Sequence, residues 1–373
     1  MRVGINGEPL FQRVATGAGV YTLALAEALA AIGQAGNVVL FHAAHPLVPP
    51  EVEALQLARY EFPVEREALY ASWNEARRPA PQTVCGPLDV VHAPGPMLPP
   101  AGAALLVATV HDLAPLRFPD RYPRRMRLTL KRGLRFAARE ADRIICPSNS
   151  TADEVQELLG VERDRLRVVP HGVSIPTTDE AQAREFVAGR GIKEPFVLWI
   201  GTQEERKNVA AVLDAFVQTT RNDDETTLVL HGPQGWLGAE VADGIRRRRL
   251  ETRTRVSEGG LTRQELGSLY SRASVFLFPS IYEGFGLPVL EAMASGAPVL
   301  AADRSAIPES AGDAAVLVDP DDHDALGEEL ERLLDDEDAR AELIRRGRAR
   351  AAEFTWEVAA RRTWDVYEEL VGA

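Results

Sequence analysis

Residues 280–299, SIYEGFGLPVLEAMASGAPV, decide the fold of this 373-residue chain. They follow the apolar run SVFLF at residues 274–278, which has the composition of a strand buried on both faces. Glycines separate this run from a second apolar segment, and Pro288 suits the first turn of a helix, where its missing N–H costs nothing. A strand, a glycine loop and a helix in this order predict one repeat of a parallel α/β sheet.

The start of this predicted helix is suited to binding an anion. The N–H groups of Phe285, Gly286 and Leu287 have no partner inside the helix, and the helix dipole favours negative charge beside them. Gly284 and Gly286 let a ligand approach the backbone closely. We therefore predict that these four residues bind a diphosphate.

Two glutamates flank the glycine loop. Glu291 falls in the first turn of the predicted helix, where a carboxylate repels phosphate, so we expect it to accept hydrogen bonds from a ribose diol. Glu283 precedes the glycines, and we expect it to accept hydrogen bonds from the hydroxyls of a sugar. The alternative is that Glu283 is an ordinary loop acid and that Glu291 is a helix acid favoured by the dipole.

The order EGFGLPVLEAMASGAPV resembles that of the retaining glycosyltransferases of family 4, in which two glutamates are separated by seven residues. Glu283 and Glu291 occupy these two positions. The resemblance extends over nearly the whole chain. It implies an α/β fold of the GT-B type, with two Rossmann-like domains whose parallel sheets face an interdomain cleft. It also implies that the acceptor attacks from the face that the diphosphate leaves, with the leaving phosphate assisting its deprotonation.

A second element is IGTQEERKN at residues 200–208, after the first predicted strand of the second domain. We expect Arg206 and Lys207 to pair with the diphosphate as it gains charge on leaving. The alternative is two solvated charges at a helix start. The family resemblance supports Lys207 more closely than Arg206, because Thr202 stands where the family commonly has its arginine. The order GTxxxRKN is similar to that of many mannosyltransferases and implies GDP-mannose as the donor.

In the first half of the chain, His111 follows the apolar run ALLVATV. This places it at the carboxyl end of a predicted strand, where α/β proteins bind ligands. The resemblance implies that His111 faces the donor sugar and the acceptor, whereas a structural histidine is the alternative. We expect the neighbouring Asp112 to fix the loop.

Gly17 and Gly19, in GAGVY, stand just before a predicted helix. They are similar to the family's GxGxY loop, which approaches the donor phosphate and the acceptor. Two features argue against a dinucleotide site: Thr22 stands in place of the third glycine, and the next strand, VVLFHAAH, ends without an acid. The protein is therefore not expected to bind NAD.

Two short motifs have structural alternatives. Residues 171–173, His-Gly-Val, match the family's hinge-side motif near the donor, and a linker role is equally compatible with them. Residues 319–321, Asp-Pro-Asp, precede a helix predicted from about Ala325, so we interpret them as a helix cap and not as a metal site. Because we find no His or Cys cluster with ligand spacing, we predict neither a metal nor another cofactor.

Strand-like runs alternate with helical patterns along the chain, which is typical of parallel sheets wrapped by helices. We predict an N-terminal acceptor-binding domain at residues 1–175 and a nucleotide-sugar-binding domain at residues 176–355. A terminal helix at residues 356–373 is expected to pack on the first domain. The predicted strands cover residues 2–6, 38–41, 90–92, 105–110, 143–146, 166–170, 196–200, 227–231, 275–278 and 298–301.

The formal net charge of −13 argues against nucleic acid as a partner, because phosphate binding needs a basic surface. One local run, Arg121–Arg139, nevertheless holds eight Lys or Arg residues and no acid. It is a candidate for contact with an anionic membrane or a lipid-phosphate acceptor. The alternative is a helix whose buried face contains Met126, Leu130, Leu134 and Ala137.

The chain has two cysteines, Cys85 and Cys146, which does not indicate a disulfide framework. It begins with a short strand-like segment in place of a charged and apolar leader, and no stretch reaches about 18 apolar residues. We therefore expect a cytoplasmic protein, with peripheral contact at the inner face of the membrane through the basic run.

These features predict a metal-independent glycosyltransferase. It would move a hexose from a nucleotide diphosphate donor to a saccharide or lipid-linked acceptor in glycan or glycolipid synthesis. Two alternatives share the same fold, because fold alone does not fix function. One is a nucleotide-sugar epimerase and the other is a non-catalytic nucleotide-sugar-binding protein.

Overall fold

The computed structural model describes residues 1–12, 17–219, 225–235 and 237–372. The chain divides into two compact units. One contains residues 1–172 and the C-terminal residues from Trp356, and the other contains Val173–Thr355. The sequence placed the first boundary near residue 175, and the structure divides at Gly172. Ala373, the last residue of the predicted terminal helix, lies outside the described residues.

The first unit is built on a seven-stranded parallel sheet in the order β3-β2-β1-β4-β5-β6-β7. Val3 of β1 pairs with Val38 of β2 on one side and with Val90 of β4 on the other. The strands are β1 (Val3–Asn6), β2 (Val38–Ala44), β3 (Ala58–Glu65), β4 (Val90–Ala93), β5 (Leu105–Thr109), β6 (Arg143–Cys146) and β7 (Leu166–Val168).

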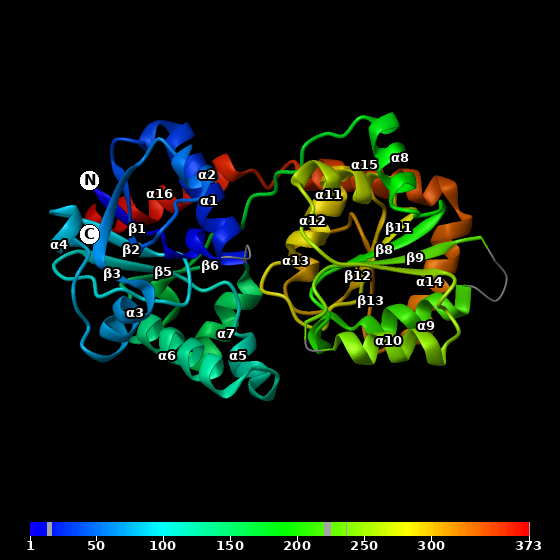
Figure 1. Cartoon of the computed structure of the whole chain (residues 1–373), viewed down its shortest axis with the longest axis horizontal. Helices are drawn as coiled ribbons and strands as arrows, with labels where there is room; N and C mark the ends of the chain where they lie inside the picture. The colour runs from blue at the N-terminus through cyan, green and yellow to red at the C-terminus, as the bar shows by residue number, and fades with distance from the viewer. Residues whose placement is uncertain (13–16, 220–224, 236, 373) are drawn as a thin grey trace. The chain divides into compact units, whose positions relative to one another are not determined.

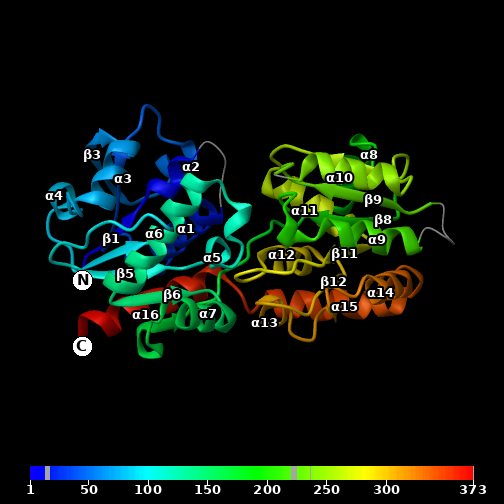
Figure 2. The ribbon, with the colours of Figure 1, turned by 90° about the horizontal axis from the view of Figure 1, so that it is seen from below.

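Helices cover both faces of this sheet, which explains why its inner strands are almost continuously apolar. Val3 and Ile5 face a core shared with α1 and α16, whereas Phe41 faces an opposite core that contains Trp73 of α3. Figure 2 shows α16 alongside β6 in this unit, and α16 also contacts α1 and β5. The helices are α1 (Gly17–Leu29), α2 (Pro50–Glu53), α3 (Arg66–Glu75), α4 (Gln82–Cys85), α5 (Ala114–Arg117), α6 (Arg124–Glu140), α7 (Asn149–Leu159) and α16 (Trp356–Gly372).

The second unit is built on a six-stranded parallel sheet in the order β10-β9-β8-β11-β12-β13. Strands β8 and β11 are neighbours in the sheet, although two strands and three α-helices of the described residues lie between them in the sequence. The strands are β8 (Phe196–Ile200), β9 (Thr227–His231), β10 (Thr254–Ser257), β11 (Val275–Phe278), β12 (Val299–Ala302) and β13 (Val316–Val318).

Two separate cores lie on the two faces of this sheet. Figure 1 shows α9, α10 and α14 on one face and α11, α12 and α15 on the other. Local capping sets several helix starts, and Thr262 and Glu265 form a capping box at the start of α11. The helices are α8 (Glu180–Gly189), α9 (Val209–Thr219), α10 (Gly238–Arg247), α11 (Arg263–Arg272), α12 (Leu287–Ser295), α13 (Ile307–Ala311), α14 (His323–Asp335) and α15 (Glu337–Ala351).

The prediction of two parallel-sheet, Rossmann-like domains is confirmed. All ten predicted strands are present with small shifts at their ends. Because every strand pair in each sheet is parallel, the loops that follow the strands gather at one edge of that sheet. The residues that follow β8 and β11 therefore share the carboxyl edge of the second sheet, and those that follow β5 and β7 share that of the first.

Candidate functional site

Three charged side chains meet at the carboxyl edge of the second sheet. Glu283, which is 8% exposed, accepts hydrogen bonds from Lys207 Nζ at 2.5 Å and from Arg206 Nη1 at 3.3 Å. The hydroxyl of Ser280 donates a third hydrogen bond to the same carboxylate at 2.6 Å. Arg206 also pairs with Glu204 at 2.6 Å. The sequence assigned the two cations to a diphosphate and Glu283 to a sugar, whereas the structure brings them into direct contact.

The backbone fixes this cluster. The short helix η5 (Glu205–Lys207) ends at Asn208, whose φ of 52° turns the chain into α9. The carbonyl oxygen of Arg206 accepts hydrogen bonds from Ile281 N at 2.8 Å and from Ser280 Oγ at 2.9 Å. The loop after β8 is thus bonded to the loop after β11, and this bonding sets the position of Glu283 opposite Lys207.

Electrostatics keep the cluster charged in spite of burial. Burial raises the pKa of Glu283, but the charges of Lys207 and Arg206 outweigh it and hold this pKa below its ordinary value. Burial lowers the pKa of Lys207, and Glu283 opposes that effect. A buried ion pair adds little net stability, but removal of one partner leaves an uncompensated charge. An anionic ligand at this edge would meet two cations that are already paired with Glu204 and Glu283, so it would have to share these cations with the carboxylates or displace them.

The glycine loop leads directly into α12, as predicted. Gly286 is the N-cap, with φ of 95°, and a Cβ atom there would lie 2.9 Å from Ser310 Oγ. Both observations explain why this position needs glycine. Pro288 lies in the first turn, and Phe285 packs edge-to-face on Phe354 with ring centroids 5.8 Å apart. Val289 N donates to the carbonyl oxygen of Gly286 at 3.0 Å, and the dipole of α12 favours an anion at this helix start.

The position predicted for Glu291 in the first helical turn is wrong. It is the fifth residue of α12, because the helix begins only at Leu287, and no acid lies in the first turn. Its carboxyl accepts a hydrogen bond from Tyr270 Oη at 3.3 Å. Burial raises the pKa of Glu291 to about 7, although Tyr270 and Arg263 oppose this shift. The side chain is therefore largely protonated in slightly acidic solution.

The predicted capping role of Asp319 and Asp321 is also wrong. Both carboxylates pair with Arg304, each at 2.7 Å. The N-cap of α14 is the next residue, Asp322, which accepts a hydrogen bond from Ala325 N at 3.0 Å. The two carboxylates share the single cation Arg304 and form an ion-pair cluster in the loop after β13.

His111 lies at the carboxyl edge of the first sheet, after β5. Its Nε2 is 2.8 Å from the carbonyl oxygen of Pro94, and its Nδ1 is 3.1 Å from Nε2 of His171. The ring of Tyr21 meets it edge-on at 4.8 Å. Burial lowers the pKa of His111, although Pro94 opposes this effect. Asp112 accepts a hydrogen bond from Ala114 N at 2.9 Å, which is the loop-fixing role expected for it.

Gly17 and Gly19 do not precede the helix as predicted. They lie within the first turn of α1, which begins at Gly17. Gly19 is buried and Gly17 is exposed, and a Cβ atom at Gly17 would meet nothing within 4 Å. Their assignment to phosphate or acceptor binding stays a prediction.

The basic run forms η3 (Pro119–Arg121) and α6, and its apolar positions differ from the prediction. Leu134 and Ala137 are buried, but Met126 is 48% exposed. Leu128, which the prediction did not consider, is 56% exposed. The first two turns of α6 therefore present apolar and basic side chains together on the surface of the first unit.

A buried cluster near the end of β1 was not predicted from the sequence. Glu8, which is fully buried, accepts hydrogen bonds from Ala43 N at 2.6 Å, His45 Nε2 at 2.9 Å and Arg66 Nε at 2.7 Å. Glu8, His42 and His45 offer ligand atoms within 4.8 Å of one another. The His-x-x-His spacing of residues 42 and 45 is the signal that could have found them. Arg66 already compensates the charge of the Glu8 carboxylate, so this carboxylate does not need a metal ion to balance it.

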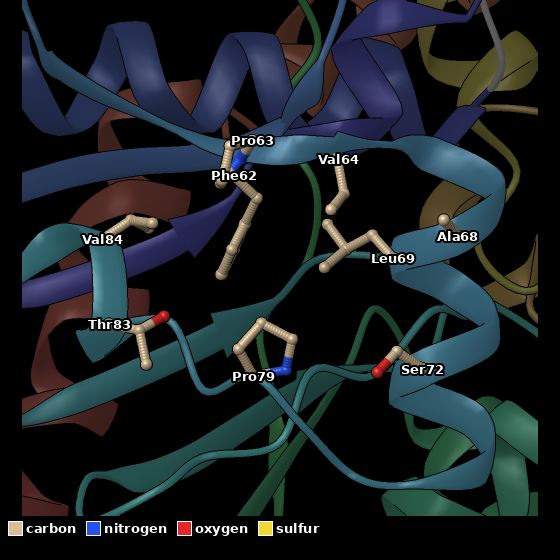
Figure 3. A pocket seen from close by; sticks show the side chains of 9 residues that line it. All are labelled: Phe62, Pro63, Val64, Ala68, Leu69, Ser72, Pro79, Thr83 and Val84. Atoms are coloured by element: carbon tan, nitrogen blue, oxygen red, sulfur yellow. The ribbon is translucent and has the colours of Figure 1, made fainter.

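A pocket of about 370 Å³ lies in the first unit between β3, α3 and α4. Figure 3 shows that Phe62 and Leu69 point into it. Its lining contains no ionisable side chain and none of the predicted site residues: Phe62, Pro63, Val64, Ala68, Leu69, Ser72, Pro79, Thr83 and Val84. This pocket lacks the groups that a diphosphate or a sugar transfer requires.

Among the described residues, no helix has both the length and the apolar character needed to cross a membrane. The sequence matches two family models. "Glycosyltransferase Family 4" covers residues 15–175 and "Glycosyl transferases group 1" covers residues 182–350. Together the two models cover both units of the fold.

Two curated relatives are named as mannosyltransferases. The O-antigen chain mannosyltransferase B of Escherichia coli is 29% identical, over 71% of this chain and 70% of its own length. An MMP α-(1→4)-mannosyltransferase of Mycolicibacterium hassiacum is 32% identical, over 63% of this chain. The match spans 56% of that protein, which is little more than half of it.

A solved structure supports the fold assignment. Anabaena HepE, in complex with UDP and glucose, superposes with a TM-score of 0.77 over 99% of each chain at 17% identity. At this identity the likeness concerns the fold. The predicted GT-B fold class is thereby confirmed.

Proposed function

Because this chain belongs to family 4 of the glycosyltransferases, we propose that it transfers a hexose from a nucleoside diphosphate sugar with retention of configuration. The observation that carries this proposal is the cluster of Lys207, Arg206 and Glu283 beside the start of α12. Two cations and a helix N-terminus suit a diphosphate leaving group. The carboxylate of Glu283, which is fixed by these contacts, can accept hydrogen bonds from the hydroxyls of the sugar and stabilise the positive charge that develops on the sugar.

GDP-mannose is our proposed donor. The relatives named above are mannosyltransferases, and the segment GTxxxRKN at residues 201–208 is similar to that subgroup. Glu291 is assigned to the nucleoside, because it lies one turn beyond the helix start proposed for the diphosphate. Its carboxyl would meet the ribose hydroxyls.

We propose that transfer needs no metal ion. A divalent ion in other transferases neutralises the leaving diphosphate, and here Arg206, Lys207 and the α12 dipole supply positive potential at the same place. The acceptor is proposed to be a saccharide or a lipid-linked saccharide bound by the first unit. Its binding residues there would include His111, Gly17 and Gly19.

The proposed setting is the cytoplasm, with peripheral contact at the inner face of a membrane. Cys85 and Cys146 are buried free thiols, as expected of a reducing compartment. The exposed basic and apolar side chains of α6 support the membrane contact.

A donor screen tests the proposal. GDP-mannose, UDP-glucose and ADP-glucose are compared by thermal shift, because a ligand that binds only the native state raises the melting temperature with concentration. We expect GDP-mannose to stabilise the protein most. With GDP-mannose and a pool of acceptors, GDP release that requires an acceptor supports transfer. Release of an altered sugar nucleotide without an acceptor would indicate an epimerase, and binding without any release would indicate a sensor.

A further inference from the structure

The hydrogen bonds of His111 determine which of its nitrogens carries the proton. The carbonyl oxygen of Pro94 can only accept, so His111 Nε2, 2.8 Å away, must be the donor. Burial lowers the pKa of His111 and keeps the ring neutral near pH 7, so Nδ1 is an acceptor. The donor to Nδ1 must therefore be Nε2 of His171, 3.1 Å away.

The packing around His171 fixes the position of its ring and therefore of the donor Nε2. It is 4% exposed, and its ring stacks on Trp356 at the start of α16, with ring centroids 6.2 Å apart and planes 15° apart. Tyr21 packs against both histidines, at 4.7 Å from His171 and 4.8 Å from His111. The next residue, Gly172, comes so close to α16 that a Cβ atom there would lie 2.4 Å from Trp356 N.

A buried hydrogen-bond chain supports this packing from behind. Tyr21 Oη lies 3.4 Å from Thr109 Oγ1, which lies 2.8 Å from His92 Nε2. His92 Nδ1 lies 2.6 Å from Tyr367 Oη of α16. Strands β4 and β5 and helices α1 and α16 therefore all contribute to the wall against which the two histidines rest.

We propose that His171 is a positioning residue that fixes the tautomer and the orientation of His111 by donating one hydrogen bond to its Nδ1. This inference rests on the proposed function of His111 at the sugar. The two-nitrogen anchoring leaves no ring nitrogen of His111 available as a base in the ligand-free protein. A substrate hydroxyl that donates to His111 Nδ1 has to compete with His171 for this nitrogen. His171 therefore determines how the ring of His111 is oriented and how much free energy is needed to replace the existing hydrogen bond.

The test compares His171→Leu with His171→Gln in the full chain. Leu removes the donor, and the amide of Gln restores it. With ¹⁵N-labelled histidine, we expect the wild type to show His111 as the Nε2–H tautomer and His171→Gln to keep it. We expect His171→Leu to raise the pKa of His111, because it removes the hydrogen bond to Nδ1 that stabilises the neutral ring, whereas Asp112, Tyr21, His92 and Pro94 are unchanged. His42→Leu, which removes an equally buried histidine of the same unit, should leave the His111 resonances unchanged.

Turnover gives a second readout. We expect His171→Leu to lower kcat by roughly three- to tenfold, the effect of one lost hydrogen bond, with the donor KM little changed, and His171→Gln to recover it. An Nδ1–H tautomer of His111 in the wild type would overturn the proposal, as would a His111 pKa that does not respond to His171→Leu. Because the tautomer and the pKa are read without turnover, failure of the proposed activity would leave this test intact.

Discussion

Glu283 and Glu291 lie eight positions apart in the sequence, and their surroundings shift their pKa values in opposite directions. Glu283 is held ionised by Lys207 and Arg206, whereas burial beside Tyr270 raises the pKa of Glu291 to about 7. Two carboxyls whose pKa values are pushed apart suit different tasks. The charged one suits a centre that becomes positive, and the other suits hydroxyls that change little during the reaction.

The two glutamates should therefore differ in steady-state kinetics. If Glu291 binds the nucleoside as proposed, its removal takes away binding that is equal in the ground and transition states, so Glu291→Ala should mainly raise the donor KM. If Glu283 lies at the reacting sugar as proposed, its removal takes away stabilisation of developing charge, so Glu283→Ala should lower kcat by roughly 10² to 10³. The donor is varied at saturating acceptor, at a temperature where both variants are folded. If Glu283→Ala changes only KM while Glu291→Ala abolishes kcat, the two roles are reversed.

The raised pKa of Glu291 also has a consequence for stability. Its folded-state pKa of about 7 lies above the ordinary value of 4.5, so the folded protein holds a proton that the unfolded chain releases. The contribution is complete below about pH 4.5 and is lost as the pH rises through about 7. We expect the free energy of unfolding of ligand-free wild type to fall across this window relative to Glu291→Gln. Urea unfolding at a series of pH values measures it, and a wild-type-minus-variant difference that does not change with pH would rule out the shift.

At the scale of elements, α6 combines features that the core does not need. Its inner face packs closely, since a Cβ atom at Gly133 would lie 1.9 Å from the carbonyl oxygen of Pro96. Its first two turns instead expose Met126 and Leu128 among arginines. A surface of this kind suits the interface of an anionic membrane, where apolar side chains enter and basic ones pair with headgroups.

Membrane binding through α6 should be sensitive to salt. We expect the wild type to sediment with phosphatidylserine-containing liposomes at low salt and to be released at high salt. The variant Met126→Ser/Leu128→Ser and the variant Arg124→Ser/Arg125→Ser should both bind more weakly. Arg246→Ser/Arg247→Ser, which removes two exposed arginines from α10, is the charge-matched control. Equal sedimentation of all four proteins, or none by the wild type, would refute a membrane role for α6.

Some of the strands could be predicted from the sequence and others could not. The inner strands were predicted because both of their faces are buried and their sequences are apolar. Strands β3, β10 and β13 were missed, and all three are sheet edges with few buried side chains. At an edge the apolar signal is weak, and β3 even carries charged residues and Pro63, which discourage further pairing.

In the candidate site, too, local features could be predicted from the sequence and contacts between distant residues could not. The glycine loop and α12 are adjacent in the sequence, so their pattern could be interpreted locally. The contact of Lys207 with Glu283 joins residues 76 positions apart and depends on β8 and β11 being neighbours in the sheet. The pairing of His111 with His171 likewise depends on the order of β5, β6 and β7. Strand order is not written in any local pattern, so neither contact could be predicted.

For the whole molecule, we propose that side chains and a helix start stabilise the charge of the leaving diphosphate, and this proposal bears on metal dependence. If Arg206, Lys207 and α12 receive the diphosphate, activity should persist in EDTA at a level close to that in buffer. Initial rates with GDP-mannose are compared in EDTA, in magnesium and in manganese. Loss of turnover in EDTA that magnesium or manganese restores would contradict metal-independent transfer.

We propose that the second unit binds the donor diphosphate through Lys207. Isothermal titration of GDP-mannose into the full chain, in EDTA, tests it most directly with wild type, Lys207→Met and the control Arg272→Met. Arg272 is also a paired cation of the second unit, bound to Glu194 at 2.6 Å. Loss of a charge-assisted contact worth about 1.5 to 3 kcal/mol should weaken binding by Lys207→Met roughly 10- to 150-fold and leave Arg272→Met like the wild type. Equal affinity of wild type and Lys207→Met for GDP-mannose would contradict the account.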